Sequence, residues 1–361
     1  MAVRVRRRSL DWTKSGYGGA VAAESPIIAI LGAPGVPDPP NLDEIGELAE
    51  IRHCTADTLP KVLSGAEILL VWDFFSRALK DNWGEATSAL RWVHVCAAGV
   101  DSLLFDELRV SPVVVTNAAG VFDGPIAEFV LASILARDKQ IHLSRRLQSQ
   151  QTWRHRETTR TAGTSALVIG TGGIGRAVAR LLRAVGIDVA GAGRTAREHD
   201  PDFGVVHETA RLCGVVGDFD TVVAIAPLTP QTERMINAEV LRAMRPDAHL
   251  VNVGRGQLVD EPALITALQT GEIGAASLDV FTEEPLDPAS PLWAMDTVAI
   301  SPHMSGDVVG WRSELADQFL ANLRRYLDRE DRSPAEVLRN VVDKDRGYVV
   351  TAGRNTGDSR V

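Results

Sequence analysis

The sequence predicts an α/β protein built from two doubly wound parallel-sheet lobes. The first observation is that short apolar runs of strand length alternate with helical segments along nearly the whole chain. This alternation is typical of a parallel sheet with helices on both faces. The second is the length of 361 residues, 45% of them hydrophobic, which suits two cores better than one.

The charge balance excludes several kinds of partner. The formal net charge is −9, from 38 basic and 47 acidic residues. The chain therefore has no general basic field for nucleic acid or an anionic membrane. No apolar run approaches the roughly 18 residues that a membrane span needs. We expect no nucleic-acid or membrane partner, and an anionic substrate would be held by a few local cations.

The three cysteines indicate a reducing compartment. Cys54, Cys96 and Cys213 lie far apart and form no C-x-x-C pair, which argues against a disulfide framework or a zinc site. We expect no metal and a cytoplasmic location.

The N-terminal "RRRSL" (Arg6 to Leu10) resembles a twin-arginine export signal, but no hydrophobic region follows it. Residues 1–25 are expected to form a disordered basic arm or to reflect an upstream start codon.

The first lobe is expected to begin at Pro26. Its strands are predicted at "PIIAILG", "AEILLVW", "LRWVHVCAAG" and "PVVVTNAAG", with short helices at "NLDEIGELA" and "FDEL". Apolar residues at helical spacing then predict one long helix over 124–150. The polar stretch "SQQTWRHRETTRTAG" that follows has the composition of a linker.

The second lobe repeats the alternation. Strands are predicted at "ALVIG", "DVAGAG", "TVVAIAP", "AHLVNVG", "IGAASLDV" and "TVAIS", with helices at 173–185, 231–245 and 260–270. A last helix over 310–328 is long enough to return to the first lobe. We expect a substrate domain of residues 26–123 plus 304–335, a nucleotide-binding domain of 124–303 and a polar tail of 336–361.

"ALVIGTGGIG" predicts a phosphate cradle. Gly170, Gly172 and Gly175 have the spacing G-x-G-x-x-G between a predicted strand and a predicted helix, which Gly173 and Ile174 open. In a Rossmann βαβ unit these glycines allow a tight turn, close approach of the pyrophosphate and close helix packing. A glycine turn without a ligand and a methyltransferase loop remain alternatives.

Arg194 suggests which nucleotide binds. It stands 19 residues past Gly175, where NAD-binding proteins carry an acid for the ribose 2′-hydroxyl. An arginine there favours the 2′-phosphate of NADP, and Thr195 and Arg197 supply further donors. A charge-assisted hydrogen bond contributes about 1.5–3 kcal/mol. We expect NADP to be preferred; the alternative is a surface arginine that stacks on adenine in an enzyme that uses NAD.

Candidate site residues, four of them charged or titratable, follow several strands of the second lobe, where open parallel sheets bind ligands. These residues are Pro227, Arg255, Asp279, Glu284 and His303. Each has an ordinary alternative: a surface cation, an acid in a solvated loop, or a loop histidine with satisfied hydrogen bonds. Their recurrence at one edge of one sheet, beside the glycine turn, favours a shared site.

From Pro26 to Arg332 the chain resembles the D-isomer-specific 2-hydroxyacid dehydrogenases of the short, glyoxylate/hydroxypyruvate reductase type. The resemblance rests on "GTGGIG", "PLTPQT", "INAEVLRAMRPDAHLVNVGRGQLVDEPAL", "GAASLDVFTEEPL" and "SPHMSG" in that order. It implies a flavodoxin-like substrate lobe, a Rossmann nucleotide lobe and a homodimer. The loop "AAGVD" matches the family's substrate loop, whose backbone amides hold the carboxylate.

The same resemblance assigns residues. It implies that Arg255, Glu284 and His303 are catalytic and that Asp279 lies near the nicotinamide amide. The cofactor residues that we expect are Gly170, Gly172, Gly173, Ile174, Gly175, Arg194, Thr195, Arg197, Pro227, Val253, Asp279 and Gly306. The substrate residues are Ala98, Gly99, Val100 and Arg255.

Reduction of a 2-keto acid needs these residue types. Arg255 can bind two oxygens at once through its planar fork. Histidine, with an unperturbed pKa of about 6.5, suits a general acid near neutrality, and the carboxylate of Glu284 would favour its charged form.

Two other functions remain open. One is oxidation of formate or phosphite on the same scaffold, which favours NAD and needs additional cations around a small pocket. The other is a nucleotide-sensing binding protein of the corepressor kind, which would bind the reduced cofactor without consuming it.

Overall fold

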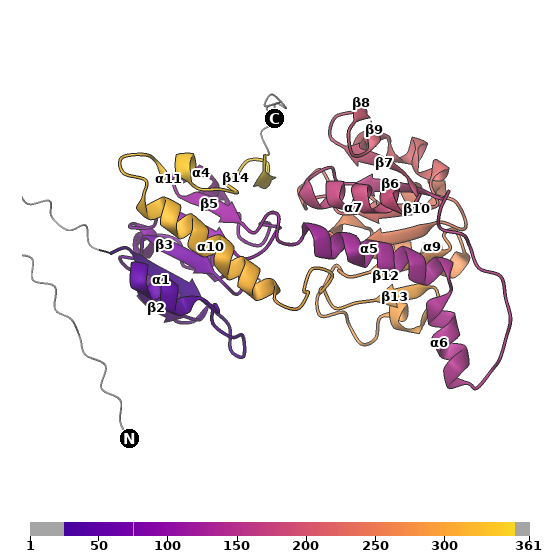
Figure 1. Ribbon diagram of the computed structural model, residues 1–361, viewed down its shortest axis with the longest axis horizontal. Helices are drawn as coiled ribbons and strands as arrows, with labels where there is room; N and C mark the ends of the chain where they lie inside the picture. The colour runs from indigo at the N-terminus through magenta and orange to yellow at the C-terminus, as the bar shows by residue number, and fades with distance from the viewer. Residues whose placement is uncertain (1–24, 75, 351–361) are drawn as a thin grey trace, which may run out of the picture.

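The computed structural model describes residues 25–74 and 76–350, and its two lobes each contain a parallel sheet (Figure 1). This arrangement confirms the predicted fold class. The basic arm predicted for residues 1–25 lies outside the described residues except for Ser25, as do residues 351–361 of the predicted tail.

The first sheet has five parallel strands in the order β2-β1-β3-β4-β5. This is the flavodoxin-like order, with its switch point between β1 and β3. The strands are β1 (Ile27–Leu31), β2 (Glu50–Cys54), β3 (Ile68–Val71), β4 (Trp92–Val95) and β5 (Val114–Asn117). The helices between them are α1 (Leu42–Leu48), α2 (Leu59–Leu63), α3 (Ala78–Asp81) and α4 (Asp106–Val110).

The second sheet has the order β13-β12-β11-β10-β6-β7-β9-β8 and is parallel except for the edge pair β8–β9. Its parallel strands form the Rossmann order, with the switch point between β6 and β10. The strands are β6 (Ser165–Ile169), β7 (Asp188–Gly193), β8 (Arg197–Asp200), β9 (Gly204–Glu208), β10 (Thr221–Ala224), β11 (His249–Asn252), β12 (Ala275–Leu278) and β13 (Val298–Ile300). The main helices are α7 (Gly173–Ala184), α8 (Ala238–Ala243) and α9 (Glu261–Thr270).

The last long helix, α10 (Trp311–Leu327), crosses back to the first lobe, as the sequence predicts (Figure 1). The indole of Trp92 in β4 stacks on Phe319 and Tyr326 of this helix at centroid distances of 5.2 and 5.5 Å. All three side chains are fully buried. After α10 the chain forms α11 (Pro334–Val337) and a small hairpin of β14 (Val342–Asp343) and β15 (Tyr348–Val349).

The single helix predicted over 124–150 is wrong. The segment forms α5 (Asp123–Asp138) and α6 (Ile141–Ser149), separated by Gln140 in the left-handed conformation at φ 50°. The side chain of Gln140 bonds the linker instead, since Arg156 Nε lies 2.7 Å from its Oε1. The tertiary contact with the linker therefore ends a helix that the apolar spacing would continue.

Other elements also differ from the prediction. Strand β2 was not predicted because it is a half-exposed edge strand without an apolar run. The hairpin β8–β9 was missed because both strands are largely exposed or half-buried and neither contains an apolar run of strand length. Helix 231–245 shortens to α8 because the side chain of Asn237 accepts hydrogen bonds from the amides of Glu239 and Val240 and starts the helix there.

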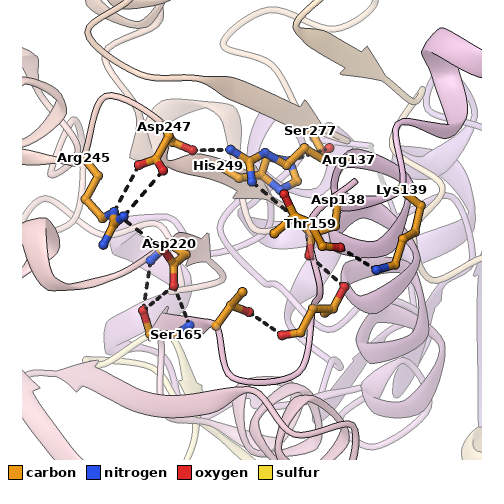
Figure 2. Close-up of polar contacts among 12 residues, drawn as sticks. Arg137, Asp138, Lys139, Thr159, Ser165, Asp220, Arg245, Asp247, His249 and Ser277 are labelled. Carbon is orange, nitrogen blue, oxygen red and sulfur yellow. Dashed lines mark hydrogen bonds and ion pairs between the residues drawn. The ribbon is translucent and has the colours of Figure 1, made fainter. Parts of the chain in front are cut away.

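A polar network closes the amino-terminal edge of the second sheet (Figure 2). Asp220 Oδ2 accepts bonds from the amide and hydroxyl of Ser165 at 2.8 and 2.9 Å. Arg245 pairs with Asp247 at 3.1 Å, and Arg137 at the end of α5 donates to the carbonyl of Asp247. These contacts join α5 to the edge opposite the strand ends that carry the candidate site, so we assign them a structural role.

No helix among the described residues combines the length and apolar character that crossing a bilayer requires.

The low pKa values of two buried histidines predict how the stability of the fold depends on pH. Burial lowers the pKa of His94 and of His249 to about 3, and Arg137 adds to the shift at His249. The unfolded chain takes up a proton at each site below about pH 6.5, whereas the folded chain does not until about pH 3. The free energy of unfolding is therefore expected to fall as pH decreases across this window.

The substitution His249→Gln tests this dependence, since glutamine can keep the 2.9 Å contact to Ser277 and does not titrate. The free energy of unfolding of the variant, measured by urea denaturation between about pH 6.5 and 4, should change less steeply with pH. His53→Gln, at an exposed position, is the matched control. Equal slopes for the wild type and His249→Gln would contradict the prediction.

Candidate active site

The glycine turn between β6 and α7 is shaped for a phosphate group. Gly170 has φ +123°, and a Cβ there would lie 2.7 Å from the carbonyl oxygen of Ile225. A Cβ at Gly175 would lie 1.9 Å from the carbonyl oxygen of Gly170. A Cβ at Gly172 would have no neighbour within 4 Å, and no side chain caps α7. The first and third glycines are thus required by close packing, while the second leaves the helix N-terminus open, which fits a dinucleotide.

Two other residues of the turn have defined neighbours. A Cβ at Gly173 would lie 2.7 Å from Oδ2 of Asp123, the first residue of α5. Burial raises the pKa of Asp123, although Arg180 and the amide of Gly120 counteract part of the shift. The side chain of Ile174 packs against the core that joins the two lobes. The cradle is therefore built jointly by the start of α5 and the start of α7.

The two arginines that were predicted to bind the nucleotide have different surroundings in the structure. Arg194 and Thr195 are exposed directly after β7. The guanidinium of Arg194 donates a hydrogen bond to the hydroxyl of Tyr348 and lies 5.4 Å from the centre of its ring. Arg197 instead lies in β8, with its Nε 3.2 Å from Asp200 Oδ2. Arg194 is thus the cation at the end of β7, and Arg197 is turned toward the hairpin.

The remaining predicted residues follow the carboxyl ends of the neighbouring strands. Pro227 comes after β10 and is exposed, and Val253 comes after β11 and is buried, with its amide bonded to Ala224 at 3.1 Å. Gly306 lies beyond β13, where a Cβ would approach Phe122 to 2.7 Å. At this point the segment that leads into α10 contacts the segment that leads into α5.

His303 and Glu284 form a pair. His303 Nδ1 lies 2.7 Å from Glu284 Oε2, and both side chains are about 30% exposed. Burial acts to raise the pKa of Glu284, but hydrogen bonds from His303 and from the amide of Phe281, with the charge of Arg255, outweigh it and lower the pKa. Glu284 is therefore a carboxylate near neutral pH, and its contact orients the imidazole through Nδ1. The other ring nitrogen, Nε2, is the one that a substrate would meet.

Asp279 positions the loop that carries His303. Its carboxylate is fully buried and accepts bonds from the amides of Met304 and Ser305, both at 2.9 Å. The hydroxyl of Ser301 donates to the same carboxylate, and the amide of His303 donates to the backbone carbonyl of Asp279 at 2.8 Å. Asp279 thus ties the ends of β12 and β13 together and fixes where His303 stands.

Arg255 faces the first lobe. Its Nε lies 3.0 Å from Oδ1 of Asp101, and its Nη1 donates to the carbonyl of Gly254 at 2.8 Å. A Cβ at Gly99 would lie 2.0 Å from Arg255 Nη2. The guanidinium therefore rests directly on the backbone of the Gly99 loop, and a side chain at position 99 would displace it.

The first-lobe loop presents backbone to this guanidinium. Val100 is 1% exposed, so its side chain belongs to the core. The carbonyl of Ala98 accepts a 2.6 Å bond from Asn117, which fixes the loop on β5. The loop Ala98–Val100 is thus fixed in place, and its backbone contacts the guanidinium of Arg255 at Gly99.

Sequence reasoning missed three residues of this region. Asp101 ends the quoted loop "AAGVD" and was read only as part of it, although an acid near an expected cationic site is a signal. Asp123 and Tyr348 gave no signal, because each reaches the site only through the packing of distant segments.

The arrangement defines a class of protein. An open glycine turn, a cation beyond β7, and an arginine and a histidine–glutamate pair at the same sheet edge form the site of a two-lobed dinucleotide-dependent oxidoreductase.

Similarity to known proteins identifies the family. Residues 131–305 match the NAD binding domain of D-isomer specific 2-hydroxyacid dehydrogenases. The chain is 32% identical to a hydroxyphenylpyruvate reductase of Plectranthus scutellarioides over 67% of its length and 77% of the relative's. It is 30% identical to a glyoxylate reductase of Thermococcus onnurineus, covering 72% and 79% of the two chains.

A solved structure agrees with these matches. A D-isomer specific 2-hydroxyacid dehydrogenase from Xanthobacter autotrophicus, in complex with NADPH and MES, superposes with a TM-score of 0.75 at 31% identity, over 90% of this chain and all of that one. The chain belongs to the D-isomer specific 2-hydroxyacid dehydrogenase family and is an oxidoreductase that uses a nicotinamide cofactor.

Proposed function

We propose that the protein reduces small 2-keto acids to D-2-hydroxy acids with NADPH, glyoxylate and hydroxypyruvate being the first substrates to test. The observation that carries the proposal is that Arg255 contacts Gly99 and Asp101 of the opposite lobe, while its charge also acts on Glu284, the partner of His303. The glyoxylate and hydroxyphenylpyruvate reductases among its relatives act on acids of this chemistry.

Arg255 binds and polarises the substrate. Its guanidinium lies against the backbone of Gly99, so a substrate carboxylate that enters here and displaces this contact would have the arginine fork and the loop amides as its donors. The same cation draws electron density toward the keto oxygen and stabilises the negative charge that develops there. Asp101 keeps the guanidinium directed at the loop.

His303 supplies the proton. Glu284 accepts a hydrogen bond from Nδ1, so we assign donation of the proton to the keto oxygen to Nε2 of the protonated ring. Because Glu284 stays ionised near neutral pH, it stabilises the imidazolium before transfer. Asp279 holds the loop that sets the direction of this donation.

The cofactor supplies the hydride when it is bound. The residues that we propose to hold it run along the carboxyl edge of the second sheet. They are Gly170, Gly172, Gly173, Ile174, Gly175, Arg194, Thr195, Pro227, Val253, Asp279 and Gly306, whereas Arg197 is excluded because it pairs with Asp200. Their fit rests on the open face of Gly172 and the uncapped N-terminus of α7.

A turnover assay tests the proposal. Oxidation of the reduced cofactor is followed by absorbance with a panel of 2-keto acids, once with NADPH and once with NADH. Consumption of NADPH that depends on a small 2-keto acid is expected. A protein that binds NADPH and consumes none with any member of the panel would instead be a nucleotide sensor.

The preference for NADP rests on Arg194. Since one charge-assisted hydrogen bond contributes about 1.5–3 kcal/mol, Arg194→Ala should lower kcat/KM for NADPH relative to NADH by roughly ten- to hundredfold. Arg197→Ala is the matched control, because Arg197 pairs with Asp200, and it should have the smaller effect. An unchanged cofactor ratio in Arg194→Ala would remove this residue from the 2′-phosphate site.

We propose a homodimer in which α6 and the following linker form the interface. They project from the second lobe (Figure 1) and expose Trp153 fully and Ile141 by 54%. Exposed large apolar side chains on a projecting arm are typical of an interface. The double variant Ile141→Asp/Trp153→Ser should be monomeric by light scattering, while Val309→Ser, at an exposed apolar residue elsewhere, should leave the dimer intact. A wild-type monomer would contradict this proposal.

A further inference from the structure

We propose that Tyr348 is a specificity-determining residue for the cofactor, placed beside Arg194 to complete the subsite for the 2′-phosphate of NADPH. This inference rests on the proposed use of NADP and adds a second element, which the first lobe supplies. The element is the hairpin of β14 and β15 near the end of the described chain, which lies between the two lobes (Figure 1).

The hairpin is fixed to the first lobe. Lys344 Nζ donates to the carbonyl oxygens at the end of α4 and beyond it, those of Leu108, Ser111 and Val113, at 3.0, 2.6 and 3.1 Å. Arg109 donates in return to the carbonyl of Lys344. Three carbonyl acceptors around one ammonium group, in a half-buried position, make this a specific anchor.

The two strands of the hairpin are also held by contacts with the first lobe and with each other. Val342 is 5% exposed and packs in the core of the first lobe, and Val341 forms a bridge to Thr116 of β5. Val342 pairs with Val349, and Asp343 with Tyr348. Because its neighbours on the hairpin are held in this way, Tyr348 has a defined position, although it stands outside the first-lobe core.

Tyr348 reaches the second lobe at Arg194. The guanidinium carbon lies 5.4 Å from the centre of the tyrosine ring, and Nη2 donates a hydrogen bond to the tyrosine hydroxyl. Arg194 is exposed, and an exposed arginine side chain has many rotamers to lose on binding a ligand. The ring face and the hydroxyl of Tyr348 reduce this freedom before the nucleotide arrives.

The hydroxyl also suits a phosphate. An oxygen that accepts a hydrogen bond from arginine keeps its own hydrogen, which can be donated to a phosphate oxygen beside the guanidinium. A neutral donor adds to the arginine without charge repulsion. The gain is confined to a nucleotide that carries a 2′-phosphate, because a ribose 2′-hydroxyl offers no anionic oxygen to the pair.

The test compares nucleotide binding by Tyr348→Phe and the wild type. Dissociation constants for NADPH, NADH, 2′,5′-ADP and 5′-AMP are measured by calorimetry on the full chain. Loss of the hydroxyl should weaken NADPH and 2′,5′-ADP by roughly tenfold and leave NADH and 5′-AMP unchanged. Lys344→Met, which loosens the anchor, should act in the same direction. Arg346→Gln, an exposed hairpin cation paired with Asp343, is the control and should bind like the wild type.

A double-mutant cycle shows whether Tyr348 acts through Arg194. In the Arg194→Ala background, Tyr348→Phe should weaken NADPH less than in the wild type, because the arginine is no longer there to be positioned. An equal loss for NADPH and NADH would overturn the inference. If Arg194→Ala discriminates against NADPH while Tyr348→Phe does not, the inference fails and the proposed function stands. If Arg194→Ala itself leaves the ratio unchanged, both the proposed cofactor and the inference fail.

Discussion

Replacing His303 with Asn is expected to lower kcat for 2-keto acid reduction by roughly 10²–10⁴-fold, the usual contribution of a positioned general acid. Asparagine can keep the contact to Glu284 that the Nδ1 atom makes at 2.7 Å but cannot deliver a proton. Binding of NADPH, measured by titration, should stay close to that of the wild type. Wild-type turnover in this variant would exclude His303 as the acid.

Glu284→Gln tests the contribution of the carboxylate that pairs with that histidine. The wild-type carboxylate is ionised near neutral pH and favours the charged imidazole. Its loss should move the alkaline limit of keto-acid reduction to lower pH, whereas turnover at mildly acidic pH should persist. The measurement is kcat/KM against pH for the wild type and the variant. An unchanged profile would remove Glu284 from acid–base catalysis.

Replacement of Arg255 has the second large effect. Two charge-assisted hydrogen bonds to a keto acid, at about 1.5–3 kcal/mol each, correspond to a loss of roughly 10²–10⁴-fold in kcat/KM for Arg255→Ala. Arg255→Lys keeps the charge but not the planar fork and should recover only part of the activity. Steady-state kinetics with the best substrate of the panel provides both values. Equal activity of the Ala and wild-type enzymes would contradict the assigned role.

Gly99→Ala tests the role of Arg255 independently, through a residue of the other lobe that contacts it. The added methyl group would meet Arg255 Nη2 at 2.0 Å, so the flexible end of the arginine must move. Activity should therefore fall while the fold persists, as judged by an unchanged melting temperature and NADPH affinity. Gly124→Ala, where a Cβ has no neighbour within 4 Å, is the matched variant and should retain activity.

The sequence predicted the parts of this site that depend on strand ends. Gly170, Arg255 and His303 each follow an apolar run, and parallel strands bring their carboxyl ends to one edge. The glycine spacing also predicted the packing at Gly175, where the helix approaches the strand too closely for a side chain. The fold class followed from the same alternation.

The remainder depends on contacts between distant segments. Asp101 became a partner of Arg255 only when the two lobes faced each other, 154 positions apart in sequence. The contact of Tyr348 with Arg194 has the same separation and arises from a hairpin too short to leave an apolar pattern. Gln140 interrupts a helix because Arg156 bonds it, which helical periodicity along α5 does not reveal.

The most direct test of the central claim is a crystal structure of the protein with NADPH and a non-reactive 2-keto acid analogue such as oxamate. We expect the pyrophosphate at the glycine turn before α7 and the analogue's carboxylate between Arg255 and the amides of the Gly99 loop. His303 should then lie within hydrogen-bond distance of the oxygen that represents the keto group. A nucleotide bound away from the turn, or an analogue bound without Arg255 and His303, would contradict this account.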